Sequence, residues 1–267
     1  VQQLKMEEEL RDAMRENELE LRYQPQVNAR TGEVVSMEAL VRWKHPTRGM
    51  VSPLEFIPVA ERTGQIIELG EWVMGEVARN CQYWDSMGLK PFHVCINISP
   101  LQFNQSNLPQ WIESFLTRSG LDPTRLELEL TESAIMNDAQ TNIEKLTKLK
   151  ELGLKLAVDD FGTGYSSLSY LKRFPIDTLK IDQSFVADLS RADGAAIVDA
   201  IIALSKTLNL RAIAEGIEER EQLDYLVTRG CDLLQGYFFS HPLYPEDVPD
   251  MLRHNFGEDV KGKDPQT

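Results

Sequence analysis

Apolar and polar residues alternate along two neighbouring stretches near the start of the chain. The first stretch is LRYQPQV and the second is EVVSMEALVRW, and only the short turn NARTG separates them. Alternation with a period of two is typical of strands that bury one face, and so short a turn joins antiparallel neighbours. The pattern therefore predicts an N-terminal β-hairpin.

Beyond the hairpin, helical patterns alternate with short strand-like runs. The expected helices cover about 53–87, 108–119, 138–152, 166–173, 194–208 and 221–229. The expected strands are FHVCINIS, LELELT, KLAVDDF, TLKID, RAIAEGI and LLQGYFF. With the hairpin they predict an α/β fold, a TIM-like (β/α)8 barrel whose first strand is antiparallel to the others. A doubly wound open sheet is the alternative, but no GxGxxG loop follows a strand, which disfavours its nucleotide-binding version.

The two ends of the chain differ from the middle in composition. Residues 1–20 place Leu4, Leu10, Met14 and Leu19 among many charges, which predicts an amphipathic helix. We interpret 1–20 as a linker helix from an upstream domain, although a helix that packs on its own domain explains the pattern as well. The barrel domain is then expected over 21–254, and the polar tail 255–267 is expected to be disordered.

Composition and charge exclude several classes of protein. Hydrophobic residues make up 42% and charged residues 26% of the chain, as in globular proteins, and we expect no membrane segment in it. The formal net charge of −14 disfavours binding to nucleic-acid polymers. Cys81, Cys95 and Cys231 form no close pair, which indicates a reducing compartment. We expect a cytoplasmic domain, and the parent protein could be tethered to a membrane.

Polar side chains stand at the C-terminal ends of seven of the eight expected strands. They are Glu38, Asn97, Glu129, Asp159 with Asp160, Lys180, Glu215 and Gln235. Strand parity supports an inward orientation, because Leu126, Leu128 and Leu130 share one face while Glu127 and Glu129 share the other. In a barrel, the C-terminal strand ends are where catalytic residues gather.

Five of these strand-end residues are carboxylates directed at one small space, and like charges this close raise one another's pKa unless cations lie between them. Oxygen ligands without histidine favour Mg²⁺ or Mn²⁺ over Zn²⁺. The four histidines have no metal-ligand spacing, so we interpret them as structural. The pattern thus predicts a site for hard divalent cations.

Seven motifs stand in a fixed order over roughly 19–252: MEALVRW, NIS, ELTES, DDFGTGYSSL, LKID, AEGIE and QGYFF. With these motifs the chain resembles the EAL-domain family of cyclic di-GMP phosphodiesterases. The resemblance implies hydrolysis of cyclic di-GMP to linear 5′-pGpG by in-line attack of a water that two Mg²⁺ or Mn²⁺ ions activate, with Ca²⁺ as an inhibitor. A catalytically silent cyclic di-GMP receptor is the alternative, and a one-metal barrel enzyme of another class is a third. The completeness of the acidic set favours the active enzyme.

The resemblance also implies roles for individual residues. The implied metal ligands are Glu38, Asn97, Glu129, Asp159, Asp160 and Glu215. The implied catalytic residues are Lys180, which would hold the attacking water, Glu215, Glu38 and Gln235, which would lie at the rim of the metal–water network. Whether Lys180 or Glu215 accepts the proton stays open.

The implied substrate-binding residues are Gln24, Leu40, Arg42, Asp182, Gln235, Tyr237 and Pro242. Arg42 follows Glu38 by four residues on the same strand face and could bind a phosphate oxygen. Leu40 could instead belong to the barrel core. Asp182 could accept hydrogen bonds from a guanine edge or support Lys180.

The glutamates Glu132 and Glu218 are expected to support the site from outside the ligand shell. The resemblance implies that Glu132 anchors the loop 161–168, in which Phe161, Gly162, Thr163 and Gly164 follow the acidic pair directly. Glycines allow this loop unusual backbone angles, so that it could switch conformation. The resemblance places the loop near a homodimer contact and implies an upstream sensor or GGDEF-like domain as a further partner.

Overall fold

The computed structural model describes residues 2–163 and 168–261. Within them, the sheet order is β1-β9-β8-β7-β6-β5-β4-β2-β3, and β1 also pairs with β2, which closes an eight-stranded barrel and leaves β3 outside it. Strand β1 is antiparallel to β2 and β9, whereas β2 and β4 to β9 form a parallel series. The strands are β1 (Leu19–Asn28), β2 (Val34–His45), β3 (Gly49–Val51), β4 (His93–Ile98), β5 (Leu126–Thr131), β6 (Lys155–Phe161), β7 (Thr178–Ile181), β8 (Arg211–Ala214) and β9 (Leu233–Leu234). The predicted barrel with one antiparallel strand is confirmed.

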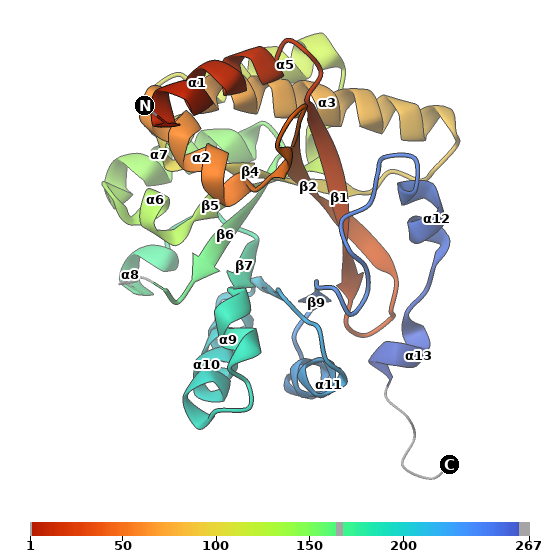
Figure 1. Cartoon of the computed structure of the whole chain (residues 1–267). Helices are drawn as coiled ribbons and strands as arrows, with labels where there is room; N and C mark the ends of the chain where they lie inside the picture. Colours follow the sequence, from red (N-terminus) through yellow and green to blue (C-terminus); the bar gives the residue numbers. More distant parts are fainter. Residues whose placement is uncertain (1, 164–167, 262–267) are drawn as a thin grey trace.

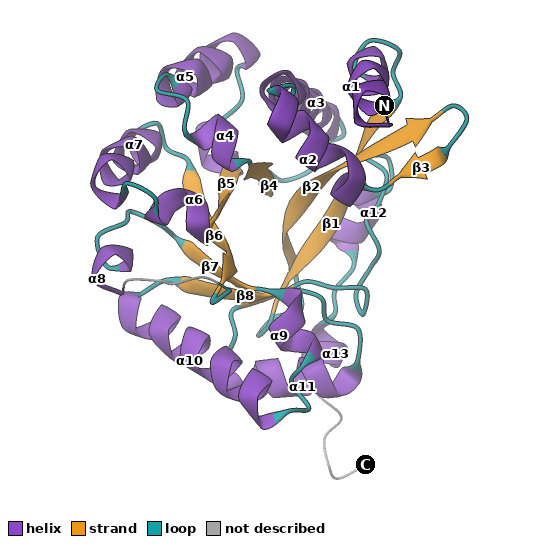
Figure 2. Cartoon of the chain, turned by 60° about the vertical axis from the view of Figure 1, so that its left-hand side comes forward, coloured by secondary structure: helices purple, strands orange, loops and turns teal. Residues whose placement is uncertain are grey.

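The helices surround the strands, so that the barrel wall forms the inner layer (Figure 2). Their order along the chain can be followed by colour in Figure 1. They are α1 (Gln2–Ala13), α2 (Pro53–Thr63), α3 (Ile66–Ser86), α4 (Pro100–Phe103), α5 (Leu108–Ser119), α6 (Glu132–Met136), α7 (Ala139–Glu151), α8 (Leu168–Leu171), α9 (Gln183–Ala187), α10 (Ala192–Leu208), α11 (Arg220–Arg229), α12 (Val248–Arg253) and α13 (Gly257–Val260). None of the described helices is both long and apolar enough to cross a membrane.

Several elements differ from the sequence prediction, which did not include short helices such as α4, α6 and α9. The expected helix 53–87 is two helices, because Gly64 adopts a φ of 80° and caps α2. Strand β3 was missed because it has only three residues, and it pairs antiparallel with the outer end of β2. Strand β9 is limited to two residues, so most of LLQGYFF lies beyond it. Of the helix expected at 166–173, residues 166 and 167 lie outside the described part of the chain.

The wall of the barrel is buried on both of its faces, as parallel sheets covered by helices are. Leu126, Leu128 and Leu130 of β5 are at most 1% exposed and belong to the main apolar core. Glu127 and Glu129, which alternate with them, are 3% and 2% exposed. Because the leucines occupy the face toward the helices, both glutamates point into the barrel, as the parity predicted.

The ends of the chain are more structured than expected. Helix α1 ends at Ala13 and residue 19 already begins β1, so the helix expected over 1–20 is shorter. Leu10 and Ala13 are fully buried in a second apolar cluster with Trp43 and Phe56. Helix α1 therefore packs on its own domain, which was the alternative interpretation of the pattern. Its role as a linker from an upstream domain stays a prediction.

The expected disorder from residue 255 onward is wrong as far as residue 261. Asn255 forms a bridge with Glu33, and Val260 of α13 is 4% exposed because it packs into the main core. The polar composition hid two apolar anchors, Val260 and Phe256, and the latter is 7% exposed in the same core. Residues 262–267 lie outside the described part of the chain.

Candidate active site at the C-terminal end of the barrel

Lys180, at the end of β7, is the centre of the polar cluster that the strand ends form. Its side chain is 1% exposed. Its Nζ atom lies near one oxygen of each of four carboxylates: 2.5 Å from Glu129, 2.6 Å from Glu215, 3.2 Å from Asp159 and 3.9 Å from Glu38. The fold thus brings together carboxylates from β2, β5 and β6 and from the residue after β8.

The cluster holds more negative than positive charge, since one ammonium group faces four carboxylates. Burial raises the pKa of Glu129 well above its usual range and that of Glu215 to about 8. Burial alone would lower the pKa of Lys180, but the surrounding carboxylates raise it well above its usual value. Lys180 is therefore a cation here, suited to stabilising negative charge rather than to accepting a proton.

Two amide side chains hold Glu38 from either side. Asn97 Nδ2 donates to one of its carboxylate oxygens at 2.7 Å, and Gln235 Nε2 donates to the other at 2.5 Å. The same Gln235 nitrogen donates to Gln24 at 3.2 Å. Burial works against ionisation of Glu38, but Lys180 and the two amides outweigh it and lower the pKa of this carboxyl. Glu38 is thus kept ionised in a buried position.

Asp160 sits where β6 leaves its regular register. The pairing of β6 with β7 is irregular between Val158 and Phe161, and Asp160 has a φ of 53°. Burial, followed by the neighbouring Asp159 carboxylate, raises the pKa of Asp160 to about 6. A left-handed residue in a strand re-aims the chain, so Asp159 faces Lys180 while Asp160 lies to the side.

The loop after Asp160 is held at two points. The Gly162 N–H donates to Glu132 Oε2 at 2.9 Å, and Thr163 Oγ1 donates to the Asp160 carbonyl at 2.8 Å. Phe161 is buried in the main core. The contact with Gly162 is the one through which Glu132 would anchor the loop. Gly164, which we had also singled out, lies outside the described residues.

A polar cavity of about 240 Å³ opens beside the cluster. Seven side chains named from the sequence line it: Gln24, Glu38, Leu40, Glu215, Glu218, Gln235 and Tyr237. Leu40 is half-buried in this lining and so does not belong to the barrel core. The cavity is where a ligand could meet the acidic cluster.

Sequence reasoning missed three residues that line the same cavity, namely Gln183, Gly216 and Gly236. Gly216 has a φ of 69°, and a Cβ atom there would come within 2.5 Å of Gln183 Cβ. Both positions directly follow a residue that we had named, Gln183 after Asp182 and Gly216 after Glu215. That adjacency was the available signal.

Of the remaining predicted substrate residues, Tyr237 lines the cavity, whereas Arg42, Asp182 and Pro242 are not among its lining residues. Arg42 is half-buried two residues beyond Leu40 on the same face of β2, and it pairs across the hairpin with Glu20. Asp182 caps α9 by accepting from the Ser184 N–H at 3.0 Å, and it raises the pKa of Asp160. Tyr237 is 51% exposed against the ring of His241, and Pro242 follows that histidine.

The donor set fits hard divalent cations, although its side chains do not already form a ligand shell. Within the described residues, no three His, Cys, Asp or Glu side chains gather about one metal position, because the carboxylates turn toward Lys180 instead. Glu215 Oε1 is ion-paired with Lys180 at 2.6 Å but accepts no well-directed hydrogen bond within the described residues. The excess of carboxylates over the single ammonium group is what a bound cation would offset.

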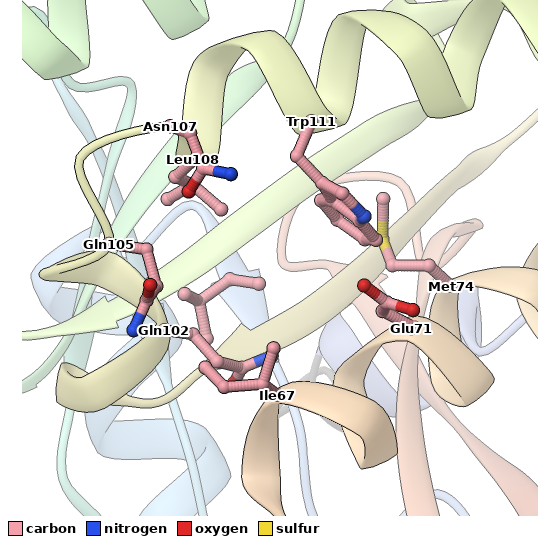
Figure 3. Close-up of a pocket in the computed structure, with 9 residues that line it drawn as sticks. Ile67, Glu71, Met74, Gln102, Gln105, Asn107, Leu108 and Trp111 are labelled. Atoms are coloured by element: carbon pink, nitrogen blue, oxygen red, sulfur yellow. The ribbon is translucent and has the colours of Figure 1, made fainter. Parts of the chain in front are cut away.

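A second cavity, of about 110 Å³, lies between α3, α4 and α5 (Figure 3). Its lining is largely apolar and includes Ile67, Met74 and Trp111, with Glu71 as the carboxylate. Gly70 lies close by, where a Cβ atom would collide with Gln102. This cavity has no cluster of titratable groups, so the acidic cluster is the stronger candidate for an active site.

Comparison with known proteins agrees with the residues gathered here. The family described as EAL domain matches residues 7–242. The bifunctional diguanylate cyclase/cyclic di-GMP phosphodiesterase MucR of Pseudomonas aeruginosa is 43% identical over 92% of this chain and 36% of its own length. The cyclic di-GMP phosphodiesterase NbdA of the same organism is 43% identical over 94% of this chain and 32% of its own length. The chain thus spans about a third of the length of these curated relatives.

The barrel also superposes closely on solved structures. A structure described as the PaMucR phosphodiesterase in complex with c-di-GMP matches with a TM-score of 0.89 at 42% identity, over 91% of this chain and 99% of that chain. The cAMP and cyclic-di-GMP bound form of the EAL enzyme Bd1971 matches with a TM-score of 0.88 at 35% identity, over 94% of this chain and 69% of that chain.

Proposed function

This chain belongs to the EAL domain family, and we propose that it hydrolyses cyclic di-GMP to linear 5′-pGpG. The observation that carries the proposal is the convergence of four carboxylates on Lys180 beside a polar cavity. The names of MucR and NbdA state this phosphodiesterase activity for relatives that match nearly the whole chain.

Phosphodiesterases of this family generally depend on a divalent metal. We propose that two Mg²⁺ or Mn²⁺ ions bind here, where they would lower the pKa of water and offset charge on the phosphodiester. Their ligands would be Glu38, Asn97, Glu129, Asp159, Asp160 and Glu215. Ca²⁺ would inhibit, because it is larger and less strict in its geometry.

Lys180 would orient the attacking water and stabilise the negative charge that develops on the phosphoryl oxygens. Its raised pKa supports this role over that of a base. Glu215, with a pKa near 8, supports proton transfer at the same point. Gln235 would keep Glu38 oriented through the 2.5 Å hydrogen bond.

Substrate binding is proposed for the cavity and its mouth. Arg42 would bind a non-bridging phosphate oxygen through its guanidinium group. A guanine base would lie against Leu40 and Gln24, with Asp182, Tyr237 and Pro242 as further contacts. The half-buried Leu40 in the cavity lining and the exposed Tyr237 ring support this arrangement.

Further parts of the proposal concern the setting of the domain. Glu132, through Gly162, would couple the loop 161–168 to Asp160 and to a homodimer contact, with Glu218 as a support on the cavity rim. An upstream sensor or GGDEF-like domain would regulate the barrel. The three free cysteines are all buried, which supports a cytoplasmic location.

The test is turnover of cyclic di-GMP with EDTA, Mg²⁺, Mn²⁺ or Ca²⁺, with pGpG followed by chromatography. We expect product only with Mg²⁺ or Mn²⁺. Tight binding of intact cyclic di-GMP without product would make the domain a silent receptor. If the domain neither forms product nor binds cyclic di-GMP, the proposal is overturned.

A further inference from the structure

A chain of buried amide groups continues from Glu38 into the interior of the barrel. Gln235 contacts Glu38 with its amide nitrogen, and its amide oxygen accepts a hydrogen bond from Gln26 Nε2 at 3.0 Å. Gln26 Oε1 in turn accepts from Ser36 Oγ at 2.5 Å and from Cys95 Sγ at 3.4 Å. Gln26, Gln235 and Ser36 are each at most 3% exposed.

The direction of these hydrogen bonds follows from the one group that can only accept. An ionised Glu38 carboxylate requires the nitrogen of Gln235, so the oxygen of Gln235 must face Gln26. That oxygen requires a donor, which turns the nitrogen of Gln26 toward it and the oxygen of Gln26 toward Ser36. The hydroxyl of Ser36 and the thiol of Cys95 can rotate to donate, so every member of the chain is satisfied.

The two possible orientations of the Gln235 amide have almost the same shape but opposite polarity. In the observed orientation, the nitrogen donates to Glu38 and to Gln24 together. In the flipped orientation, an oxygen would face the carboxylate and repel it. Gln26 in its observed orientation favours the first orientation of Gln235, because a flip of Gln235 alone would place two NH₂ groups against each other.

We propose that Gln26 is a positioning residue of the active site: through the amide of Gln235 it holds the Glu38 carboxylate in the orientation that binds a divalent cation. The inference rests on the proposed function, in which Glu38 is a metal ligand. It adds a residue that does not itself line the cavity and that reaches the site only through Gln235. Partners that orient a ligand from outside contribute measurably to metal affinity.

The fold places Gln26 for this role. In the register of the hairpin, Gln26 pairs with Ser36 and Gln24 pairs with Glu38, so both glutamines share the inward face of β1. Gln235 directly follows β9, the other neighbour of β1. Gln26 thus contacts Ser36 of β2, Cys95 of β4 and Gln235 beside β9, and through Gln235 it is connected to Glu38.

The test measures Mn²⁺ affinity by titration calorimetry in the absence of substrate, for the wild type, Gln26→Met, Gln235→Met and the double variant. Methionine keeps the length of the side chain and removes both polar atoms. The matched control is Thr178→Val, which alters an inward side chain that is 2% exposed and hydrogen-bonded to Glu127, away from this amide chain.

We expect Gln235→Met to weaken Mn²⁺ binding about tenfold, the lower end of effects from outside the ligand shell, and Gln26→Met, one hydrogen bond further from the ligand, about threefold. Because Gln26 acts through Gln235, the double variant should bind Mn²⁺ no more weakly than Gln235→Met alone. Thr178→Val should lower the melting temperature and leave Mn²⁺ affinity unchanged. The Mn²⁺ concentration for half-maximal turnover should shift in Gln26→Met by the same factor as the calorimetric constant.

Additive losses in the double variant, or a Thr178→Val effect as large as that of Gln26→Met, would show a merely structural role and overturn the inference. Unchanged Mn²⁺ affinity in Gln26→Met would overturn it as well. A wild type that binds Mn²⁺ but does not cleave cyclic di-GMP would count against the proposed function alone. A wild type that binds no Mn²⁺ would overturn both.

Discussion

Two similar glutamates lie near opposite ends of the barrel, one among basic groups and the other among carboxylates. Glu127 and Glu129 lie two residues apart on β5, both inward and both nearly fully buried. Glu127 lies toward the N-terminal end. Arg211 Nη2 donates to its two carboxylate oxygens at 2.9 Å and 3.1 Å, and Thr178 Oγ1 donates to one of them at 2.6 Å. Glu129, toward the C-terminal end, shares the single ammonium of Lys180 with three other carboxylates.

Charge balance, rather than burial, separates the structural acid Glu127 from Glu129, the candidate metal ligand. At the N-terminal end one carboxylate is matched by Arg211, with Lys155 also nearby, so nothing further needs to bind. At the C-terminal end the excess negative charge is stable only if protons or cations offset it. A site whose negative charge is balanced only by a bound cation is one that can bind a cation.

The most direct test of this difference between the two ends is the matched pair of variants Glu129→Gln and Glu127→Gln. Glu129→Gln should lower turnover of cyclic di-GMP at least about 100-fold, because it removes a candidate ligand. It should not destabilise the fold, since it relieves repulsion among carboxylates. Glu127→Gln should keep turnover within about twofold and lower the free energy of unfolding by about 2 kcal/mol, because it leaves Arg211 unpaired.

Steady-state kinetics and urea unfolding would check both variants. If Glu127→Gln lost turnover while its stability was unchanged, the assignment of the two ends would be reversed. Both losses in one variant would show that the two ends are coupled.

The two ends also offer a matched pair of arginines. Arg42→Ala should raise the KM for cyclic di-GMP about 10- to 100-fold through the loss of a phosphate contact. Its Mn²⁺ affinity should stay within about twofold, because Arg42 holds no metal ligand. Arg211→Ala should instead reduce stability and leave KM unchanged. Equal KM values for wild type and Arg42→Ala would remove Arg42 from the substrate site.

Much of this architecture could be predicted from local patterns. Parity placed Glu127 and Glu129 inward because a strand's period of two leaves no other choice once the leucines face the helices. The order of strands and helices led to the barrel, since parallel strands need crossover helices. The same dependence on periodicity explains why short elements were not predicted: β3 has too few residues to show a period.

What the sequence could not show was which basic or polar group each carboxylate would meet. It named Glu129 and Glu215 as metal ligands without showing that both turn toward Lys180. Nor could it separate Glu127 from Glu129, because the partners Arg211 and Thr178 come from distant strands. Gln26 carried no signal, because its role depends on a hydrogen bond to a residue 209 positions away.

Cation binding should stabilise one end of the barrel in particular. Mn²⁺ at about 100 times its dissociation constant should raise the free energy of unfolding by about 2.7 kcal/mol. For a chain of this size that corresponds to a rise of about 5–10 °C in the melting temperature. Scanning calorimetry should find this rise in wild type and in Glu127→Gln, and not in Glu38→Ala. A rise that persists in Glu38→Ala would place the cation elsewhere.

The smallest expected effect is a dependence of stability on pH that originates at the N-terminal end. Burial and the neighbouring Lys155 ammonium lower the pKa of His93 below its usual value. Lys155 Nζ lies 2.7 Å from His93 Nε2, so protonation of that nitrogen would set two cations against each other. Between this lowered pKa and about 6.5, the unfolded chain binds more protons at residue 93 than the folded chain. This contribution to stability is therefore present above pH 6.5 and is lost as the pH falls below it.

His93→Gln should remove that contribution, because an amide oxygen can accept from Lys155 at every pH. Between pH 7 and pH 5.5 the melting temperature of the wild type should fall by about 1–2 °C more than that of His93→Gln. The matched control is the exposed His254, which lies against the ring of Phe256. His254→Gln should follow the wild type, and an equal flattening in both variants would show that the cationic surroundings of His93 have no special role. A difference confined to His93→Gln would show that a further positive charge is unfavourable at this end of the barrel, where Arg211 already matches Glu127, in contrast to the carboxylate excess around Lys180.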